Sequence, residues 1–320
     1  MTEERNPLVP LRPADRLEIT CLVDNYADRL EADTEVAKRL PYSKDNEMLP
    51  GPVSEHGFSA LIKVFSNGEE HTVLFDTGVS DFAAVHNMRT LKVDPEKIEN
   101  IVLSHGHVDH TGGILSVLKE IKKKPIPVVL HPDGLRKRWI IFPNGQRARL
   151  STIDEETMVS HGASLVKNVS PFLMANDLIL ATGEIKRTTD FEKGFPFSYE
   201  ERAGELEPDF ETMDDQAIVV NVKDKGLVVI SGCGHAGIVN TVLYSQEITG
   251  EQKILGVMGG FHLTGKFFEP FIEKTIGMIK DLSPQYIVPC HCTGWKAIKT
   301  FSEAMPEAYT HNVVGTTYSF

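Results

Sequence analysis

The stretch SHGHVDHTGG, residues 104–113, places three histidines and one aspartate within six positions. It follows the run IENIV, whose apolar and β-branched residues predict a buried strand that ends at these side chains. His105 and His107 are separated by one residue, so both rings can face the same metal ion. Asp109 and His110 are adjacent in a tight loop, so their side chains diverge and can face a second ion nearby. The stretch therefore predicts a site for two metal ions at the end of a strand.

The chemistry of these side chains narrows the choice of metal. Imidazole and carboxylate together favour zinc, manganese or iron, because magnesium and calcium prefer shells made entirely of oxygen atoms. We expect two Zn²⁺ ions, with Mn or Fe as the alternatives. The competing interpretation is a solvated polar turn that carries histidines by chance, and the buried strand directly before the cluster argues against it.

Short apolar, β-branched runs alternate with helical patterns along most of the chain. Strands are predicted at 17–23, 59–65, 71–78, 98–105, 126–132, 178–184, 217–232 (with a hairpin around 223–226), 253–260 and 285–291. Helices are predicted at about 112–124, 236–248 and 267–282. This alternation predicts an α/β fold. We expect a single domain over 1–320, with long loops and short strands inserted at about 132–210, where charged, Gly, Pro and aromatic residues are concentrated.

Charge and composition limit the partners. The chain has 33 Lys and Arg against 45 Asp and Glu, a formal charge of -12, so its surface repels phosphate backbones and anionic membranes. We therefore expect neither nucleic acid nor a membrane as a partner. The metal site and the positive N-terminus of the helix predicted after it favour a small anionic molecule as the substrate. The first residues lack the apolar core of a signal peptide, and Cys21, Cys233, Cys290 and Cys292 are scattered, as is typical of reduced thiols. These features predict a cytoplasmic protein.

Three motifs together resemble the metallo-β-lactamase fold superfamily. SHGHVDH resembles its H-x-H-x-D-H signature, and VLFDTG resembles the Asp-bearing strand that precedes this signature. PCHC, after a late strand, resembles the segment with the final metal-binding histidine, here His291. The resemblance implies a four-layer αβ/βα sandwich with a metal site along the sheet edges.

Further motifs resemble one branch of that superfamily. These are CLVDN, EHGFSALI, TGEI, DDQA, SGCGHAGIVN, GGFHL and PCHCTG. They are similar to the branch named after 7,8-dihydropterin-6-ylmethyl-4-(β-D-ribofuranosyl)aminobenzene 5'-phosphate synthase. The resemblance implies a methanopterin-type condensation, so we expect a metal-dependent transferase or hydrolase that acts on a phosphorylated or pterin-like small molecule.

The superfamily resemblance also implies roles for single residues. Asp76 and Asp109 are the predicted catalytic residues; Asp76 orients either a histidine or a metal-bound water, unless it only caps its own turn. Cys233 stands where most members have an aspartate that bridges two metals, and it is either a ligand or a small buried residue beside the site. His235 is the candidate for the third histidine of the first metal, because DDQA places acids where that histidine often falls.

Substrate contacts are expected from His56, Arg136, Glu184, Arg187 and His262. His262 follows a glycine pair at a strand end, where it either approaches a substrate or packs under a loop. Arg136 belongs to GLRKRW, whose cations either hold a phosphate or form a solvated face. Glu184 and Arg187 lie in TGEIKR, on an inserted loop that the resemblance places over the active site.

Two other classes of function compete with the enzyme. One is a binding or sensing module with a structural metal, but structural zinc sites are rich in cysteine and this cluster is rich in His and Asp. The other is a di-iron redox protein, which in this superfamily commonly has glutamate in place of the second histidine. His107 occupies that position here.

Overall fold

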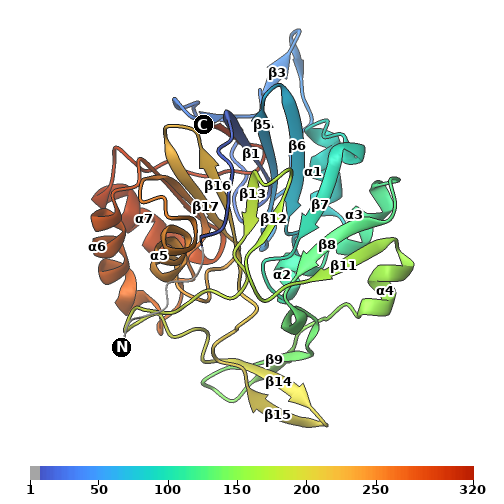
Figure 1. Ribbon diagram of the computed structural model, residues 1–320, viewed down its shortest axis with the longest axis vertical. Coiled ribbons are helices and arrows are strands. Elements are labelled where there is room, and N and C mark those ends of the chain that lie inside the picture. The colour runs from blue at the N-terminus through green and yellow to red at the C-terminus, as the bar shows by residue number, and fades with distance from the viewer. Residues whose placement is uncertain (1–7) are drawn as a thin grey trace.

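Two β-sheets lie face to face in the protein (Figure 1), which is described for residues 8–320 by a computed structural model. The first sheet has the order β11 (Ala163–Lys167), β8 (Ile126–Leu130), β7 (Ile98–Val102), β6 (Glu69–Phe75), β5 (Ser59–Ser66), β1 (Arg16–Val23), β20 (Thr317–Ser319) and β2 (Ala37–Lys38). The second sheet has the order β12 (Phe172–Met174), β13 (Ile179–Ala181), β16 (Ala217–Val222), β17 (Gly226–Ser231), β18 (Ile254–Gly260) and β19 (Tyr286–Cys290).

Helices cover the outer face of each sheet. On the first sheet lie α1 (Ala83–Thr90), α3 (Ile114–Glu120) and α4 (Glu155–Ser160), and on the second lie α5 (Ile238–Thr249), α6 (Ile272–Leu282) and α7 (Trp295–Ala304). The short helix α2 (Val108–Thr111) follows β7 and carries Asp109 and His110. Short 3-10 helices lie at Pro95–Lys97, Pro132–Leu135, Glu269–Phe271 and His291–Thr293. The order helix, sheet, sheet, helix confirms the predicted four-layer αβ/βα sandwich. Across residues 8–320, every helix is too short or too polar to cross a membrane.

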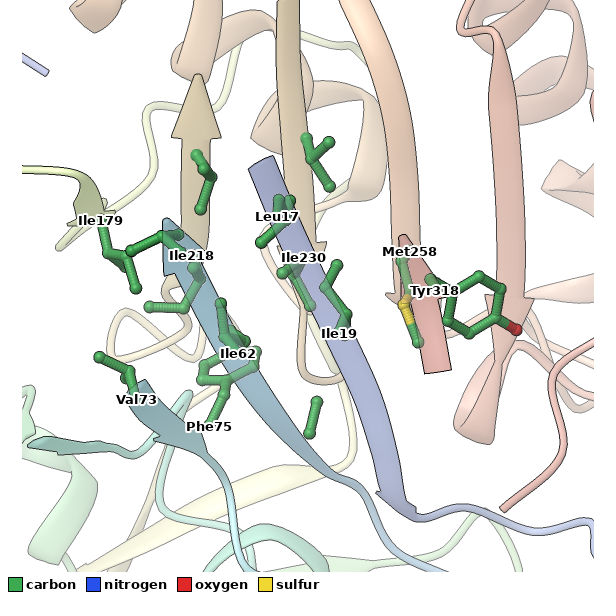
Figure 2. Close-up of a cluster of buried hydrophobic side chains, with 14 of the residues drawn as sticks. Leu17, Ile19, Ile62, Val73, Phe75, Ile179, Ile218, Ile230, Met258 and Tyr318 are labelled. Atoms are coloured by element: carbon green, nitrogen blue, oxygen red, sulfur yellow. The ribbon is translucent and has the colours of Figure 1, made fainter. Parts of the chain in front are cut away.

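Apolar side chains between the sheets form the central core. Leu17 and Ile19 of β1 and Ile62 of β5 lie with Ile218 and Ile230 of the second sheet in one cluster of fully buried residues (Figure 2). The residues that alternate with Leu17 and Ile19 along β1 are partly exposed. This alternation is typical of a strand with one face in a core.

The strands and helices predicted from periodicity are present, with shifted ends. The strand predicted over 98–105 ends at Val102, because the chain then turns to carry the histidines. The range 132–210 contributes β11, β12 and β13 to the two large sheets. It also forms a small separate sheet with the order β10 (Arg147–Arg149), β9 (Arg138–Ile141), β14 (Ser198–Arg202) and β15 (Glu205–Pro208), at the lower end of the molecule in Figure 1. A hairpin of β3 (Ser43–Lys44) and β4 (Glu47–Met48) lies at the opposite end.

Parallel strands bring the predicted site residues to one edge of the sheets. Strands β6, β7, β8 and β11 run parallel in the first sheet, and β17, β18 and β19 run parallel in the second. The loops at their C-terminal ends carry Asp76 after β6, His105 after β7, Cys233 after β17, His262 after β18 and His291 after β19. Because parallel strands present these ends together, the fold itself collects the side chains.

Gly259 in β18 is expected to tolerate no side chain. Its φ is 121°, and a Cβ there would lie 2.0 Å from the carbonyl oxygen of Ser231 on β17. Gly259→Ala should lower the free energy of unfolding by about 2–3 kcal/mol, because the backbone must leave a conformation that only glycine adopts readily. Gly277→Ala in α6 is the control, since open space surrounds that residue and the change should stabilise the helix by about 0.5–1 kcal/mol. Equal urea midpoints for the two variants would contradict this account.

Candidate metal centre

Three histidines form the first cluster of possible metal ligands. His105 and His107 follow β7, His235 lies between β17 and α5, and all three are buried. One ligand atom from each lies within 4.8 Å of the others. Nε2 of His235 is 3.2 Å from Nδ1 of His107, although 128 positions separate the two residues. The structure thus brings His235 to the place expected for the third histidine.

The second cluster joins Asp109, His110, Cys233 and His291, whose ligand atoms also lie within 4.8 Å of one another. Nε2 of His110 lies 3.1 Å from Sγ of Cys233 and 3.2 Å from Nε2 of His291. The same His291 atom is 3.4 Å from Sγ of Cys233 and 3.3 Å from Oδ2 of Asp109. Cys233 is therefore inside the cluster, which supports a role as a direct ligand rather than as a buried neighbour.

These separations match the spacing of ligands around a single metal ion. Two zinc–nitrogen bonds of about 2.0–2.1 Å at a tetrahedral angle place their nitrogens about 3.3 Å apart. Nε2 of His105 and Nε2 of His107 are buried, and they have no hydrogen-bond partner within residues 8–320. A buried polar atom without a partner costs free energy, and a metal ion would remove that cost. The residues present therefore fit bound metal ions.

The environment of the first cluster favours uncharged imidazoles. Burial lowers the pKa of His107 to about 4, and the neighbouring guanidinium of Arg138 acts in the same direction. Burial also holds the pKa of His105 and of His235 well below the usual range, with the adjacent histidines adding to the effect. Metal ligands must be deprotonated, so these side chains are in the metal-binding form at neutral pH.

Asp76 holds His110 in place. Its fully buried carboxylate lies 2.6 Å from Nδ1 of His110 and accepts hydrogen bonds from the N–H and the Oγ of Ser104, both at 2.7 Å. Burial lowers the pKa of His110, but the carboxylates of Asp76 and Asp109 outweigh burial and raise this pKa to about 9. These contacts support the first of the two roles expected of Asp76, which is to orient a histidine so that its Nε2 faces the cluster.

Asp76→Asn is expected to weaken metal binding at the second cluster about 10–100-fold, because an amide neither fixes the tautomer of His110 nor raises its basicity. Titration of metal-stripped protein against a chromophoric chelator measures the affinity of each binding step. The metal affinity of one binding step should fall, and that of the other should stay unchanged. Asp81→Asn, at an exposed carboxylate, is the control. Unchanged affinity at both steps in the Asp76 variant would refute the positioning role.

Two adjacent carboxylates anchor the loops of the first cluster. Oδ2 of Asp214 accepts a hydrogen bond from the N–H of Gly106 at 2.8 Å, between the two histidines of the signature. Oδ2 of Asp215 accepts from the N–H of Ala236 at 2.8 Å, directly after His235. Asp214 and Asp215 thus hold the backbone of the two loops that carry the histidines of the first cluster. These are the acids of DDQA, at the position where the third histidine often falls.

Arg138, the last cation of GLRKRW, is buried rather than solvated, with an exposed fraction of 1%. Its Nη2 and Nη1 donate to the two oxygens of Asp214 at 2.7 and 3.0 Å, and its Nε donates to Oδ2 of Asp209 at 2.6 Å. The two carboxylates stand 71 and 76 positions later in the chain, so no local pattern indicates the pairing. Arg138 thereby ties the small sheet to the loop of the first cluster.

Asp24, which sequence reasoning missed, supports His291. His291 has a φ of 50°, which is uncommon for a residue with a side chain. Its N–H donates to Oδ1 of Asp24 at 2.8 Å, and its carbonyl accepts from Nδ2 of Asn25 at 3.1 Å. Asp24 is fully buried and also accepts from Nδ2 of Asn312 at 2.7 Å. The available signal was an acid directly after a buried strand, in CLVDN.

Of the residues expected to contact substrate, His56 and His262 lie beside the clusters. Nε2 of His56 is 3.8 Å from Oδ2 of Asp109, and the His56 side chain is 68% exposed, at the solvent side of the second cluster. The ring of His262 lies beside that of His235, with centroids 4.3 Å apart. Both positions suit contact with a bound small molecule.

The other candidates for substrate contact engage protein groups. Arg136 forms ion pairs with two carboxylates at 2.7 and 2.9 Å. Oε1 of Glu184 lies 3.0 Å from Nε2 of His131. Arg187 donates to the carbonyl oxygen of Glu211. The structure therefore places these three side chains in the framework of the inserted range rather than in the metal clusters.

Comparison with known sequences agrees with this geometry. Residues 55–245 match the family described as the metallo-beta-lactamase superfamily. Over 270 residues the chain is 35% identical to 7,8-dihydropterin-6-methyl-4-(beta-D-ribofuranosyl)-aminobenzene-5'-phosphate synthase of Methanocaldococcus jannaschii, which covers 83% of this chain and 90% of the relative. It is also 30% identical over 275 residues to an uncharacterized protein of that organism, and this match covers 83% of this chain and 95% of the relative.

Solved structures share the fold. The crystal structure of Tm1679, described as a metal-dependent hydrolase of the beta-lactamase superfamily, matches with a TM-score of 0.72 and 28% identity over 94% of this chain and 98% of that one. The metallo-beta-lactamase fold protein YhfI from Bacillus subtilis matches with a TM-score of 0.52 and 11% identity over 96% and 100%, which reflects the fold alone. With its two clusters of ligand side chains, the chain belongs to the metallo-beta-lactamase superfamily, in the branch that contains the M. jannaschii synthase.

Proposed function

We propose that this protein is an enzyme that uses two metal ions, zinc in the simplest case, on a phosphorylated or pterin-like small molecule. The observation that carries the proposal is the pair of adjacent clusters, in which buried imidazole nitrogens face one another without other partners. The rings of His105 in the first cluster and His110 in the second lie 4.3 Å apart between centroids. This proximity would let one substrate group contact both ions.

The chemistry of such a site follows from its ligands and its exposed groups. When bound, the ions would polarise a phosphate or carbonyl oxygen and stabilise an anionic leaving group. Burial raises the pKa of Asp109, but His110 and His291 outweigh burial and hold this pKa well below the usual range, so its carboxylate is ionised. His56 stands 3.8 Å from that carboxylate at the solvent side, where an imidazole can accept the proton of an attacking group.

We propose condensation as the reaction, because the relative named as a synthase is 35% identical over most of both chains. In this reaction the nitrogen of an arylamine phosphate forms a bond to the methylene carbon of a dihydropterin pyrophosphate. The bond from that carbon to the pyrophosphate oxygen breaks, pyrophosphate leaves, and the amine proton passes to His56. Hydrolysis is the second candidate, because Tm1679, at 28% identity, is described as a hydrolase.

The two reactions are separated by one assay. Protein purified without chelators is incubated with the dihydropterin pyrophosphate, with and without the arylamine phosphate, and pyrophosphate release is followed. Condensation predicts release that requires the arylamine and yields a coupled product by mass spectrometry. Hydrolysis predicts the same release without the arylamine. No release under either condition, from protein that holds its metals, would contradict the proposed substrate class.

The composition of the clusters argues against a purely structural metal. Structural zinc sites are closed and rich in cysteine, whereas these clusters contain one cysteine and a partly exposed carboxylate, since 18% of the Asp109 side chain is accessible. A partly exposed ligand leaves room for a substrate group beside it.

A further inference from the structure

An aromatic cavity opens beside the first cluster. Its volume is about 400 Å³, and its wall includes phenylalanines of two segments that lie far apart in the sequence, together with two histidines. Among the lining residues are Phe191, Phe267, Phe268, Phe271, His235 and His262. We infer that this cavity binds the planar, uncharged heteroaromatic ring of the substrate. The inference rests on the proposed function, which it deepens by assigning the place of the pterin ring.

The cavity is continuous with the metal centre. His235 lines the cavity and also belongs to the first cluster, where its Nε2 lies 3.2 Å from His107. His262 lines the cavity next to it, with one ligand atom within 4.8 Å of those of His235 and Cys233. A ring held in the cavity would therefore carry its side group directly toward the two metal clusters.

Two buried nitrogens in the wall lack partners. Nδ1 of His235 and Nδ1 of His262 are inaccessible to solvent, and neither has a hydrogen-bond partner in the part of the chain from 8 to 320. Leaving such atoms unpaired costs free energy. A turn of the His262 ring toward the cavity would expose its Nδ1, and a bound ring that carries nitrogen and carbonyl groups at its edge would then pair with it. A purely hydrocarbon ring would offer no such partner, which favours a heteroaromatic ligand of the pterin type.

The backbone and the packing hold His262 in the wall of the cavity. Its φ is 43°, a conformation that is uncommon outside glycine and that often marks functional sites. The ring of Phe268 meets it edge-on at 4.7 Å between centroids and leaves Phe268 half-buried on the cavity side. Phe267 is 48% exposed beside it. A bound planar ring would cover these apolar surfaces and stack on them.

Two carboxylates and two ammonium groups line the cavity and balance one another, which argues against a phosphate in it. Nζ of Lys274 donates to Oδ1 of Asp190 at 2.6 Å. The carboxylate of Glu192 accepts hydrogen bonds from two N–H groups at the start of α5, both at 2.9 Å. Nζ of Lys193 donates to the carbonyl oxygen of Thr189 at 3.2 Å. The cavity thus offers an anion little free positive charge, and we place the phosphate outside it, toward the metal ions.

The test uses protein that retains its metals and two probes, the uncharged fluorescent compound 6-hydroxymethylpterin and inorganic phosphate, an anion without a ring. Wild type should quench the pterin fluorescence saturably. Phe268→Leu and His262→Ala should each weaken pterin binding at least about tenfold, because each loses stacking area or an edge contact. Their metal content and their affinity for inorganic phosphate should stay at the wild-type level. Phe82→Leu, at an exposed phenylalanine of another surface, is the control and should bind as wild type does.

The outcomes separate this inference from the proposed function. Suppose that the two cavity variants lose pterin binding and that the wild type releases no pyrophosphate in the assay above. This result would support the cavity assignment and contradict the proposed reaction. If the wild type is active but Phe268→Leu and His262→Ala bind pterin as tightly as Phe82→Leu does, the cavity assignment is wrong and the proposed reaction is unaffected. Binding of inorganic phosphate that weakens in Phe268→Leu and His262→Ala would also overturn the cavity assignment, because it would place the anion in the cavity.

Discussion

Replacing His107 and His110 together by alanine is expected to remove both metal ions and all turnover. His107 contributes a buried Nε2 without a partner to the first cluster, and His110 contributes an Nε2 that lies within 3.2 Å of Cys233 and His291 in the second. Each cluster would keep too few ligands to hold an ion against water and chelators. Mass spectrometry of the elements measures metal per chain, and pyrophosphate release in the condensation assay measures turnover.

The control for the double variant is His86→Ala, because His86 lies on α1, away from the clusters. It should keep full metal content and activity. Circular dichroism establishes that the double variant is folded before its activity is compared. A folded double variant that is free of metal and fully active would rule out metal-dependent catalysis, and one that keeps both ions would rule out these ligands.

Arg138→Met is expected to destabilise the protein by about 3–5 kcal/mol, because removing one partner of a buried ion pair leaves the carboxylates of Asp209 and Asp214 without compensation. Although burial opposes the charged form, these two carboxylates raise the pKa of Arg138, so the guanidinium is always charged. Asp214 also holds the N–H of Gly106, so the loop of the first cluster should loosen as well. Urea unfolding of metal-free protein measures the stability, and chelator competition measures the affinity of the first cluster.

Arg136→Met is the matched control for Arg138. It lies two positions earlier and also pairs with two carboxylates, but its side chain is 34% exposed. Its partner Asp133 is partly exposed, and the buried Glu200 keeps a second ion pair with Arg202, so this variant should lose much less stability than Arg138→Met. If both variants lost the same free energy of unfolding, the buried pairing of Arg138 would not be the cause.

Local sequence patterns were sufficient to predict the fold class and to predict that the main ligand candidates lie close together. The signature closely follows the strand IENIV, so the local backbone alone keeps its three histidines and Asp109 near one another. His235 could be proposed as the third histidine because it stands two positions after Cys233, in the segment that leaves β17, and the structure places it beside His107. The predicted four-layer sandwich is confirmed by the two sheets and their outer helices.

Buried polar partners could not be predicted in the same way. Arg138 stands in a run of cations that has the composition of a solvated face, and only the fold brings Asp209 and Asp214 to it. Asp24 and His291 are 267 positions apart and meet only because β1 and β19 belong to facing sheets. No strand was predicted at β11 or β12, which lie in the range 132–210 expected to hold long loops and short strands, because short strands that complete a sheet edge carry little periodicity of their own.

The central claim, that the clusters hold two ions, is tested most directly by anomalous X-ray diffraction from crystals of protein purified without chelators. Data collected on both sides of the absorption edge of zinc locate each ion and identify its element. The account predicts one peak among His105, His107 and His235 and a second among Asp109, His110, Cys233 and His291, with a substrate-accessible position on at least one ion. A single ion closed off by protein ligands, or peaks away from these residues, would contradict it.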